Sequence, residues 1–98
     1  MMTLEQLRIF VAVAEREHLT RAADALNLTP SAVSSAIRVL EERYATALFH
    51  RTGRRIELTE AGLAFLPEAK ATLARAEGAD LFLTEIGGLK RGTLALAA

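Results

Sequence analysis

The 98-residue chain contains no cysteine and only two histidines. The absence of cysteine excludes a disulfide framework and a thiolate zinc finger, and it fits a reducing cytoplasm. Two histidines without a nearby carboxylate constellation predict neither a metal site nor a set of nucleophile, base and acid. A glycine-rich phosphate loop is also missing. We therefore expect no enzyme, and no cofactor in this part of the chain.

Long apolar runs and an overall charge are missing as well. The longest apolar run near the start, Ile9 to Ala14, is too short for a signal peptide or a membrane span, so we expect a cytoplasmic protein without membrane contact. The formal net charge is zero, but between His18 and Arg55 six arginines face three acidic residues. This local excess of positive charge supports nucleic-acid binding.

The first part of the chain predicts three helices in one small domain. Thr3 and Gln6 form a capping-box pattern that opens a helix ending near Glu17. Thr20 is the expected cap of a short second helix, and Asn27 is its expected stop, because asparagine tolerates the left-handed conformation. Thr29 followed by Pro30 is the residue pair best suited to start the third helix, which should run from Pro30 to about Tyr44.

The third helix has two chemically different faces. Val33, Ile37 and Leu40 recur at helical spacing and predict a buried side. The opposite side carries small hydroxyl groups and one arginine. A short helix with one buried apolar face and hydrogen-bonding groups on the opposite face suits insertion into a DNA major groove.

A change of pattern from Ala47 to Leu58 predicts a two-stranded wing. Leu48-Phe49 and Ile56 to Leu58 are strand-like, and Gly53 is placed at the turn between them. Arginines around this turn repel one another unless an anion is near. We therefore expect the wing to reach DNA phosphates or a minor groove.

Thr59 is the expected cap of a long fourth helix. Uninterrupted from residue 60 to residue 86, this helix would be about 40 Å long, and Pro67 should kink it or remove a backbone bond. Its broken leucine stripe lacks a core of its own, so we expect a second copy of the helix to cover it. Gly87-Gly88 should break the helix, and the strand-like residues 88–98 then suggest the first strand of a further domain.

This order of parts resembles the amino-terminal region of LysR-type transcriptional regulators. The resemblance rests on Leu4-Glu5-Gln6-Leu7, on Thr20-Arg21-Ala22-Ala23, and on Ser31-Ala32-Val33-Ser34. It also rests on the spacing F-x-R-x-x-R-x-x-x-L-T-x-A-G from Phe49 to Gly62. The implied fold is mainly α: a winged helix-turn-helix of three helices plus a two-stranded wing, followed by a long dimerising linker helix. The implied domains are 1–59 for DNA binding, 60–87 for dimerisation, and 88–98 for the hinge and first strand of an effector-binding domain.

The resemblance also implies partners. They are double-stranded promoter DNA, a second copy of the chain bound through the linker helix, and a small-molecule effector that binds the missing domain. In the full-length protein a tetramer is also compatible with the resemblance. The chain departs from the family at Pro30, where many relatives carry Gln, and at Ser35 and Ala36, where longer side chains are frequent. It departs again at Ala45, where the family usually has Gly. A positive φ at Ala45 would cost about 1 kcal/mol.

Two alternatives remain open from the residues alone. One is a molybdate-responsive regulator, whose amino-terminal domain is a similar winged helix, and the other is a winged helix reused as a protein-interaction module. Our expected DNA contacts are Thr20, Arg21, Thr29, Pro30, Ser31, Ser34, Ser35, Arg38, Arg51, Arg54 and Arg55. Our expected dimer contacts are Leu63, Leu66, Leu73 and Leu81.

Overall fold

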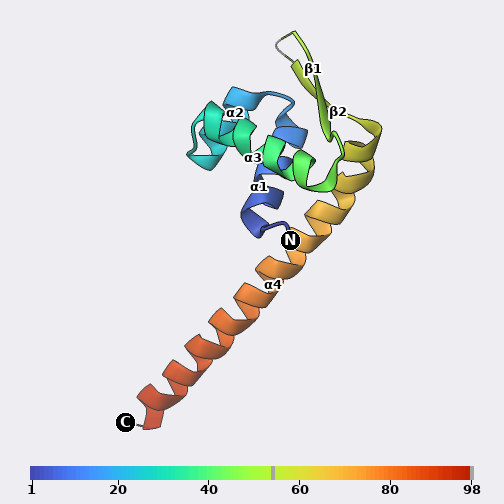
Figure 1. Cartoon of the computed structure of the whole chain (residues 1–98). Helices are drawn as coiled ribbons and strands as arrows, with labels where there is room; N and C mark the ends of the chain where they lie inside the picture. Colours follow the sequence, from blue (N-terminus) through green and yellow to red (C-terminus); the bar gives the residue numbers. More distant parts are fainter. Residues whose placement is uncertain (54, 98) are drawn as a thin grey trace.

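A computed structural model of the chain describes residues 1–53 and 55–97, with side-chain surroundings for residues up to 89. Three short helices and a β-hairpin form a compact head, from which one long helix projects (Figure 1). The whole molecule measures 63 × 24 × 19 Å. In chain order the elements are α1 (Leu4–Arg16), α2 (Leu19–Leu26), α3 (Pro30–Tyr44), β1 (Phe49–Thr52), β2 (Arg55–Leu58) and α4 (Glu60–Ala97).

Local capping explains where most of these helices begin and end. Thr3 and Gln6 form the reciprocal capping box at the start of α1, as predicted. Thr29 accepts the N–H of Ala32 at the start of α3, with Pro30 in the first turn. Asn27 ends α2 in the left-handed conformation. These boundaries confirm the sequence prediction for α1, for α3 and for the end of α2.

The predicted cap of α2 was wrong. Its N-cap is His18, whose Nδ1 accepts the backbone N–H of Arg21 at 3.1 Å, while Thr20 already lies inside the helix. The reason is that Glu17 leaves α1 in the left-handed conformation, which makes His18 the single extended residue before α2. Histidine is not among the favoured N-cap residues, so sequence preference pointed to threonine instead.

The core of the head is built around Phe10 on α1. Phe10 is completely buried, and its ring contacts Phe49 of β1 at 5.3 Å and Phe65 of α4 at 4.9 Å between centroids. Val33 and Leu40 close the core from α3. One aromatic side chain thus connects the first helix, the wing and the beginning of α4.

The wing is a two-stranded antiparallel sheet, as predicted. Phe49 pairs with Leu58, and Thr52 pairs with Arg55. Gly53 at the turn has φ +63°, a conformation that L side chains rarely adopt. Thr59 then starts α4, because its hydroxyl accepts the N–H of Gly62 at 3.0 Å.

Helix α4 is longer than predicted. It continues through Pro67 and through Gly87-Gly88 to Ala97, so the expected helix break and the expected strand over residues 88–97 were wrong; Ala98 lies outside the described residues. Neither of these glycines has a positive φ. Each costs a helix only about 1 kcal/mol relative to alanine, and the leucines, alanines and basic residues that follow are good helix formers. No helix in the described part of the chain is long and apolar enough to cross a membrane.

The first half of α4 packs on its own domain. Leu73 is buried and Leu66 is half-buried against the core of the head, where α1 runs beside α4. Leu73 therefore has little surface left for a second copy, whereas Leu66 is only partly covered. By contrast, Leu63 and Leu81 are exposed.

Candidate nucleic-acid interface

The third helix presents the small polar face that the sequence predicts. Val33, Ile37 and Leu40 are at most 3% exposed and anchor α3 in the core. Ser31, Ser35 and Arg38 are exposed, and Ser34 is half-buried. The polar face therefore lies outward on a helix that the core holds rigidly.

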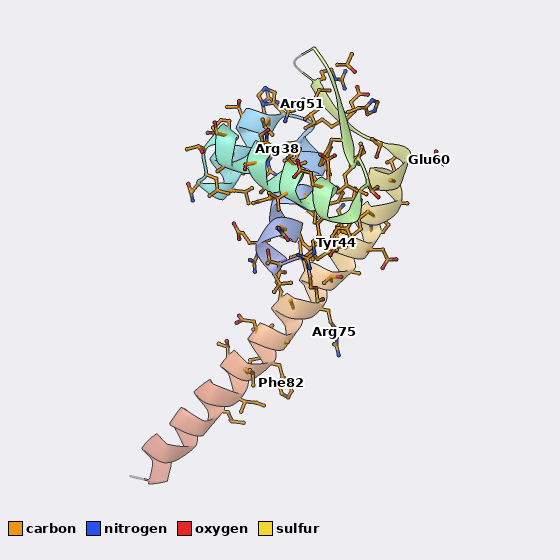
Figure 2. The ribbon with its side chains drawn as sticks, viewed as in Figure 1. Arg38, Tyr44, Arg51, Glu60, Arg75 and Phe82 are labelled. Carbon is orange, nitrogen blue, oxygen red and sulfur yellow. The ribbon has the colours of Figure 1, made fainter. Side chains whose placement is uncertain are left out.

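The wing brings one of its arginines, Arg51, to this side of the molecule beside Arg38 of α3. Arg51 on β1 donates from Nη2 to Ser34 Oγ at 2.7 Å, so it crosses directly from the wing to α3. Figure 2 places Arg38 and Arg51 together in the head, away from the projecting half of α4. A hollow between α3 and the hairpin is lined by both guanidinium groups together with Ser34. The third predicted wing residue, Arg54, lies outside the described residues.

Arg55 has different surroundings from Arg51. Its guanidinium lies 3.3 Å from a carboxylate oxygen of Glu17 and 3.5 Å from one of Glu57. These contacts tie β2 to the junction between α1 and α2, and they partly neutralise the arginine. All three side chains are well exposed, so the pairs contribute little stability. The sequence analysis missed Glu17 because nothing local to that residue points to the wing.

Of the two predicted contacts on α2, Thr20 lies beside the wing. Thr20 and Arg21 are exposed in the first turn of α2. Thr20 lines a second hollow with His18, Arg51 and Arg55. At the start of α3, the Thr29 hydroxyl is already used as a cap, whereas Pro30 is exposed. The structure therefore groups Ser34 and Arg38 with Arg51 in one hollow and Thr20 with Arg51 and Arg55 in the other. The other described site residues line neither hollow: Arg21, Thr29, Pro30, Ser31 and Ser35.

Glu41 holds the wing in place, and the sequence analysis did not identify this role. Its Oε2 accepts the backbone N–H of Leu48 at 2.7 Å and that of Phe49 at 3.2 Å. A carboxylate on α3 thus satisfies two donors where the chain enters β1. Its one sequence signal is its place in the last turns of α3, just before the wing. Within residues 1–53 and 55–97, no three side chains of His, Asp or Glu gather to hold a metal ion.

An anchored helix-turn-helix with a polar second helix and an adjoining basic hairpin defines a winged helix-turn-helix domain. Comparison with known proteins agrees with this class. Residues 4–63 match the bacterial regulatory helix-turn-helix proteins of the lysR family. The chain belongs to this family.

Its relatives are transcriptional regulators. The chain is 46% identical over 91 residues to the HTH-type transcriptional regulator BudR of Klebsiella aerogenes, which covers 93% of this chain and 62% of BudR. It is 40% identical over 96 residues to a probable RuBisCO transcriptional regulator of Thalassiosira pseudonana, which covers 98% of this chain and 31% of that protein. The chain therefore spans less than two thirds of the length of either relative.

Solved structures share the fold. The crystal structure of a CbnR DBD–DNA complex superimposes with a TM-score of 0.81 at 32% identity, over 88% of this chain and 99% of that one. The BenM DBD complex with benA site 1 DNA superimposes with a TM-score of 0.82 at 32% identity, over 88% of this chain and 97% of that one. A Corynebacterium glutamicum OxyR mutant superimposes with a TM-score of 0.77 at 40% identity, over 88% of this chain and 27% of that one. Both the DNA-bound domains and the longer protein contain this arrangement of helices and wing.

Proposed function

We propose that this chain binds promoter DNA sequence-specifically, with α3 in the major groove and the wing on the backbone or in the minor groove. It acts in the cytoplasm on the nucleoid and catalyses no reaction. The residues that contact DNA are those predicted from the sequence: Thr20, Arg21, Thr29, Pro30, Ser31, Ser34, Ser35, Arg38, Arg51, Arg54 and Arg55.

The observation that carries this proposal is the exposed polar face of α3 beside Arg51. Hydroxyl and guanidinium groups match the hydrogen-bonding edges of base pairs, and they stand on a helix whose back is buried. Two of the solved structures named above are complexes with DNA, which supports the same interpretation. A protein-interaction module has no need of guanidinium groups gathered around a helix of this kind.

We also propose that the chain binds DNA as a dimer through α4. Support comes from the exposed side chains of its projecting half, where Leu81, Phe82 and Leu83 are each more than half exposed. Leu63 remains a predicted contact, because it is also exposed. In the full-length protein, a small molecule acting on a further domain would control binding, and a tetramer would form from two such dimers.

The salt dependence of DNA affinity tests the proposed function. Affinity for duplex DNA should fall linearly in a plot of log affinity against log salt concentration. Replacing Arg51, Arg54 and Arg55 by alanine should flatten that slope by about one for each phosphate that the variant no longer neutralises. Arg55 should contribute least, because Glu17 and Glu57 already pair with it.

Arg75→Ala is the matched control for this measurement. Arg75 lies on α4 beyond the head, away from the wing (Figure 2). Its replacement removes one positive charge, as each single wing substitution does, and should leave the slope unchanged. An identical slope for the wild type, the wing triple variant and Arg75→Ala would contradict the placement of the wing on DNA.

A further inference from the structure

One hydrogen bond joins the wing to the recognition helix before any DNA is present. Arg51 Nη2 donates to Ser34 Oγ at 2.7 Å, which is at the short end of the range for charge-assisted bonds. The two residues are 17 positions apart, so only the tertiary fold brings them together. Ser34 is half-buried on α3, whereas Arg51 is exposed.

This bond limits what the Ser34 hydroxyl can do. A free serine hydroxyl rotates to donate or to accept as its partner requires. When a guanidinium N–H occupies the acceptor side of Oγ, the hydroxyl proton turns away from it, and the adjacent positive charge disfavours a second donor. Ser34 is therefore left as a donor towards any further partner.

The hydroxyl proton of Ser34 is not consumed by its own helix. On α4, the hydroxyls of Thr72 and Thr84 donate to the carbonyls four residues earlier, at 2.8 and 2.9 Å. Among the hydrogen bonds of the described residues, Ser34 makes no such bond back to α3. No acceptor among the described residues therefore takes this proton, which leaves it available to a ligand.

The neighbouring groups reinforce this donor character. A guanidinium carries five N–H donors and no acceptor, so Arg51 retains four after the bond to Ser34. Arg38 lines the same hollow and adds donors of the same kind. Glu41 also lines it, but its Oε2 already accepts two backbone N–H groups of the wing. The surface around Ser34 thus offers mainly donors.

We propose that Arg51 determines base specificity by holding Ser34 as a hydrogen-bond donor, so that this pair selects guanine in the major groove. Guanine presents two acceptors there, N7 and O6, whereas cytosine presents an amino donor and adenine a donor beside its acceptor. Thymine offers one acceptor next to a methyl group. Arg51 is a positioning residue in this arrangement, and the inference rests on the proposed reading of DNA by α3.

The test begins with selection of duplexes from a randomised pool by the 98-residue chain. Affinities are then measured for the selected duplex and for each of its single base-pair variants. The proteins are the wild type, Ser34→Ala, Arg51→Ala and the double variant. Arg75→Ala is the matched control, since it removes an arginine on α4 that lies away from the wing and from Ser34 (Figure 2).

We expect the wild type to prefer guanine at one base pair by about tenfold, within the range of a good side-chain contact to a base. Ser34→Ala and Arg51→Ala should each reduce the preference at that same base pair. The double variant should lose little more, because the two residues act as one unit. Replacing that guanine by 7-deazaguanine should weaken wild-type binding but leave both single variants nearly unaffected. Arg75→Ala should retain the wild-type profile.

Two results separate failure of this inference from failure of the proposed function. If Ser34→Ala changes the profile while Arg51→Ala weakens all sequences equally, α3 reads bases but Arg51 contacts only phosphates, and the inference is wrong. If the pool yields no preferred sequence, sequence-specific binding fails and the inference fails with it. Thermal unfolding of each variant checks that the head remains folded.

Discussion

Within residues 1–53 and 55–97, three residues other than glycine hold a left-handed backbone, and each ends a helix of the head. Glu17, Asn27 and Ala45 have φ of 49°, 56° and 49°. At Ala45 the following N–H groups close the end of α3, because Thr46 N–H donates to the carbonyl of Glu41 at 3.0 Å. Asparagine tolerates this conformation, whereas a Cβ in alanine approaches its own carbonyl oxygen. The family-typical glycine is thus missing at a position that would favour it.

Ala45→Gly should therefore stabilise the protein. Relief of the left-handed strain should raise the free energy of unfolding by about 1 kcal/mol, partly offset by the greater freedom of glycine in the unfolded chain. Urea denaturation with an unchanged m-value measures the effect. Ala36→Gly, inside α3, is the control, and its free energy of unfolding should fall by about 1 kcal/mol. A less stable Ala45→Gly protein would contradict the strain argument.

At the scale of elements, the wing is positioned by polar contacts on both sides. Glu41 accepts the backbone N–H groups of Leu48 and Phe49 where β1 begins. Thr59 follows β2, and its hydroxyl donates to the carbonyl of Ala47 at 2.7 Å while its N–H donates to that of Leu48 at 2.9 Å. Both ends of the hairpin are therefore fastened to the same short loop between α3 and β1.

Glu41→Ala should loosen the start of the wing. It leaves the N–H groups of Leu48 and Phe49, two buried residues, without their carboxylate acceptor, at a cost of about 1–3 kcal/mol. Amide hydrogen exchange should accelerate at these two positions. Glu42→Ala is the control, because Glu42 is exposed and one position away. Equal exchange rates in the two variants would show that Glu41 does not hold the wing.

Gly62 allows α4 to pass close to the loop before the wing. A Cβ at this position would overlap the Leu48 carbonyl oxygen and would lie 2.8 Å from Leu58 Cδ2. Gly62→Ala should therefore cost about 1–3 kcal/mol by overpacking. Gly78→Ala on the same helix is the matched control, because its Cβ would meet no atom within 4 Å, and it should be neutral or stabilising. Denaturant midpoints that rise for both variants would contradict the close approach.

At the scale of the whole molecule, α4 has two halves with different surroundings. The first half belongs to the head, where Ala69 and Leu73 are buried. The second half projects away from it (Figure 1), and Phe82, labelled in Figure 2, lies with Leu83 and Ala79 around a shallow hollow. Large exposed apolar side chains on a projecting helix are costly in water unless another surface covers them.

Phe82→Glu combined with Leu83→Glu should yield a folded monomer with weaker DNA binding. Each buried side chain of this size contributes about 1.5–3 kcal/mol before ordering costs. Sedimentation measures the association state, and Ala74→Glu, on the first half of α4, is the control. If the proposed dimer forms, half-sites in DNA should lie about 34 Å apart, or a multiple of that distance. A persisting dimer in the double variant would place the interface elsewhere.

Sequence pattern alone determined the local features of this protein. The boundaries of α3 followed from Thr29, Pro30 and the spacing of its apolar residues, because caps and periodicity act between near neighbours. The winged helix and its family were recognised for the same reason, since the motifs from Phe49 to Gly62 are contiguous. The outward face of α3 then followed from knowing which side was apolar.

Tertiary structure decided what depends on contacts between distant residues. The bonds from Arg51 to Ser34, from Arg55 to Glu17, and from Glu41 to the start of β1 connect positions that no local pattern relates. Leu73 belongs to the core of its own domain because α1 runs beside α4, which a leucine stripe cannot reveal. The continuation of α4 through Gly87-Gly88 is instead a local effect, because each glycine costs a helix only about 1 kcal/mol relative to alanine.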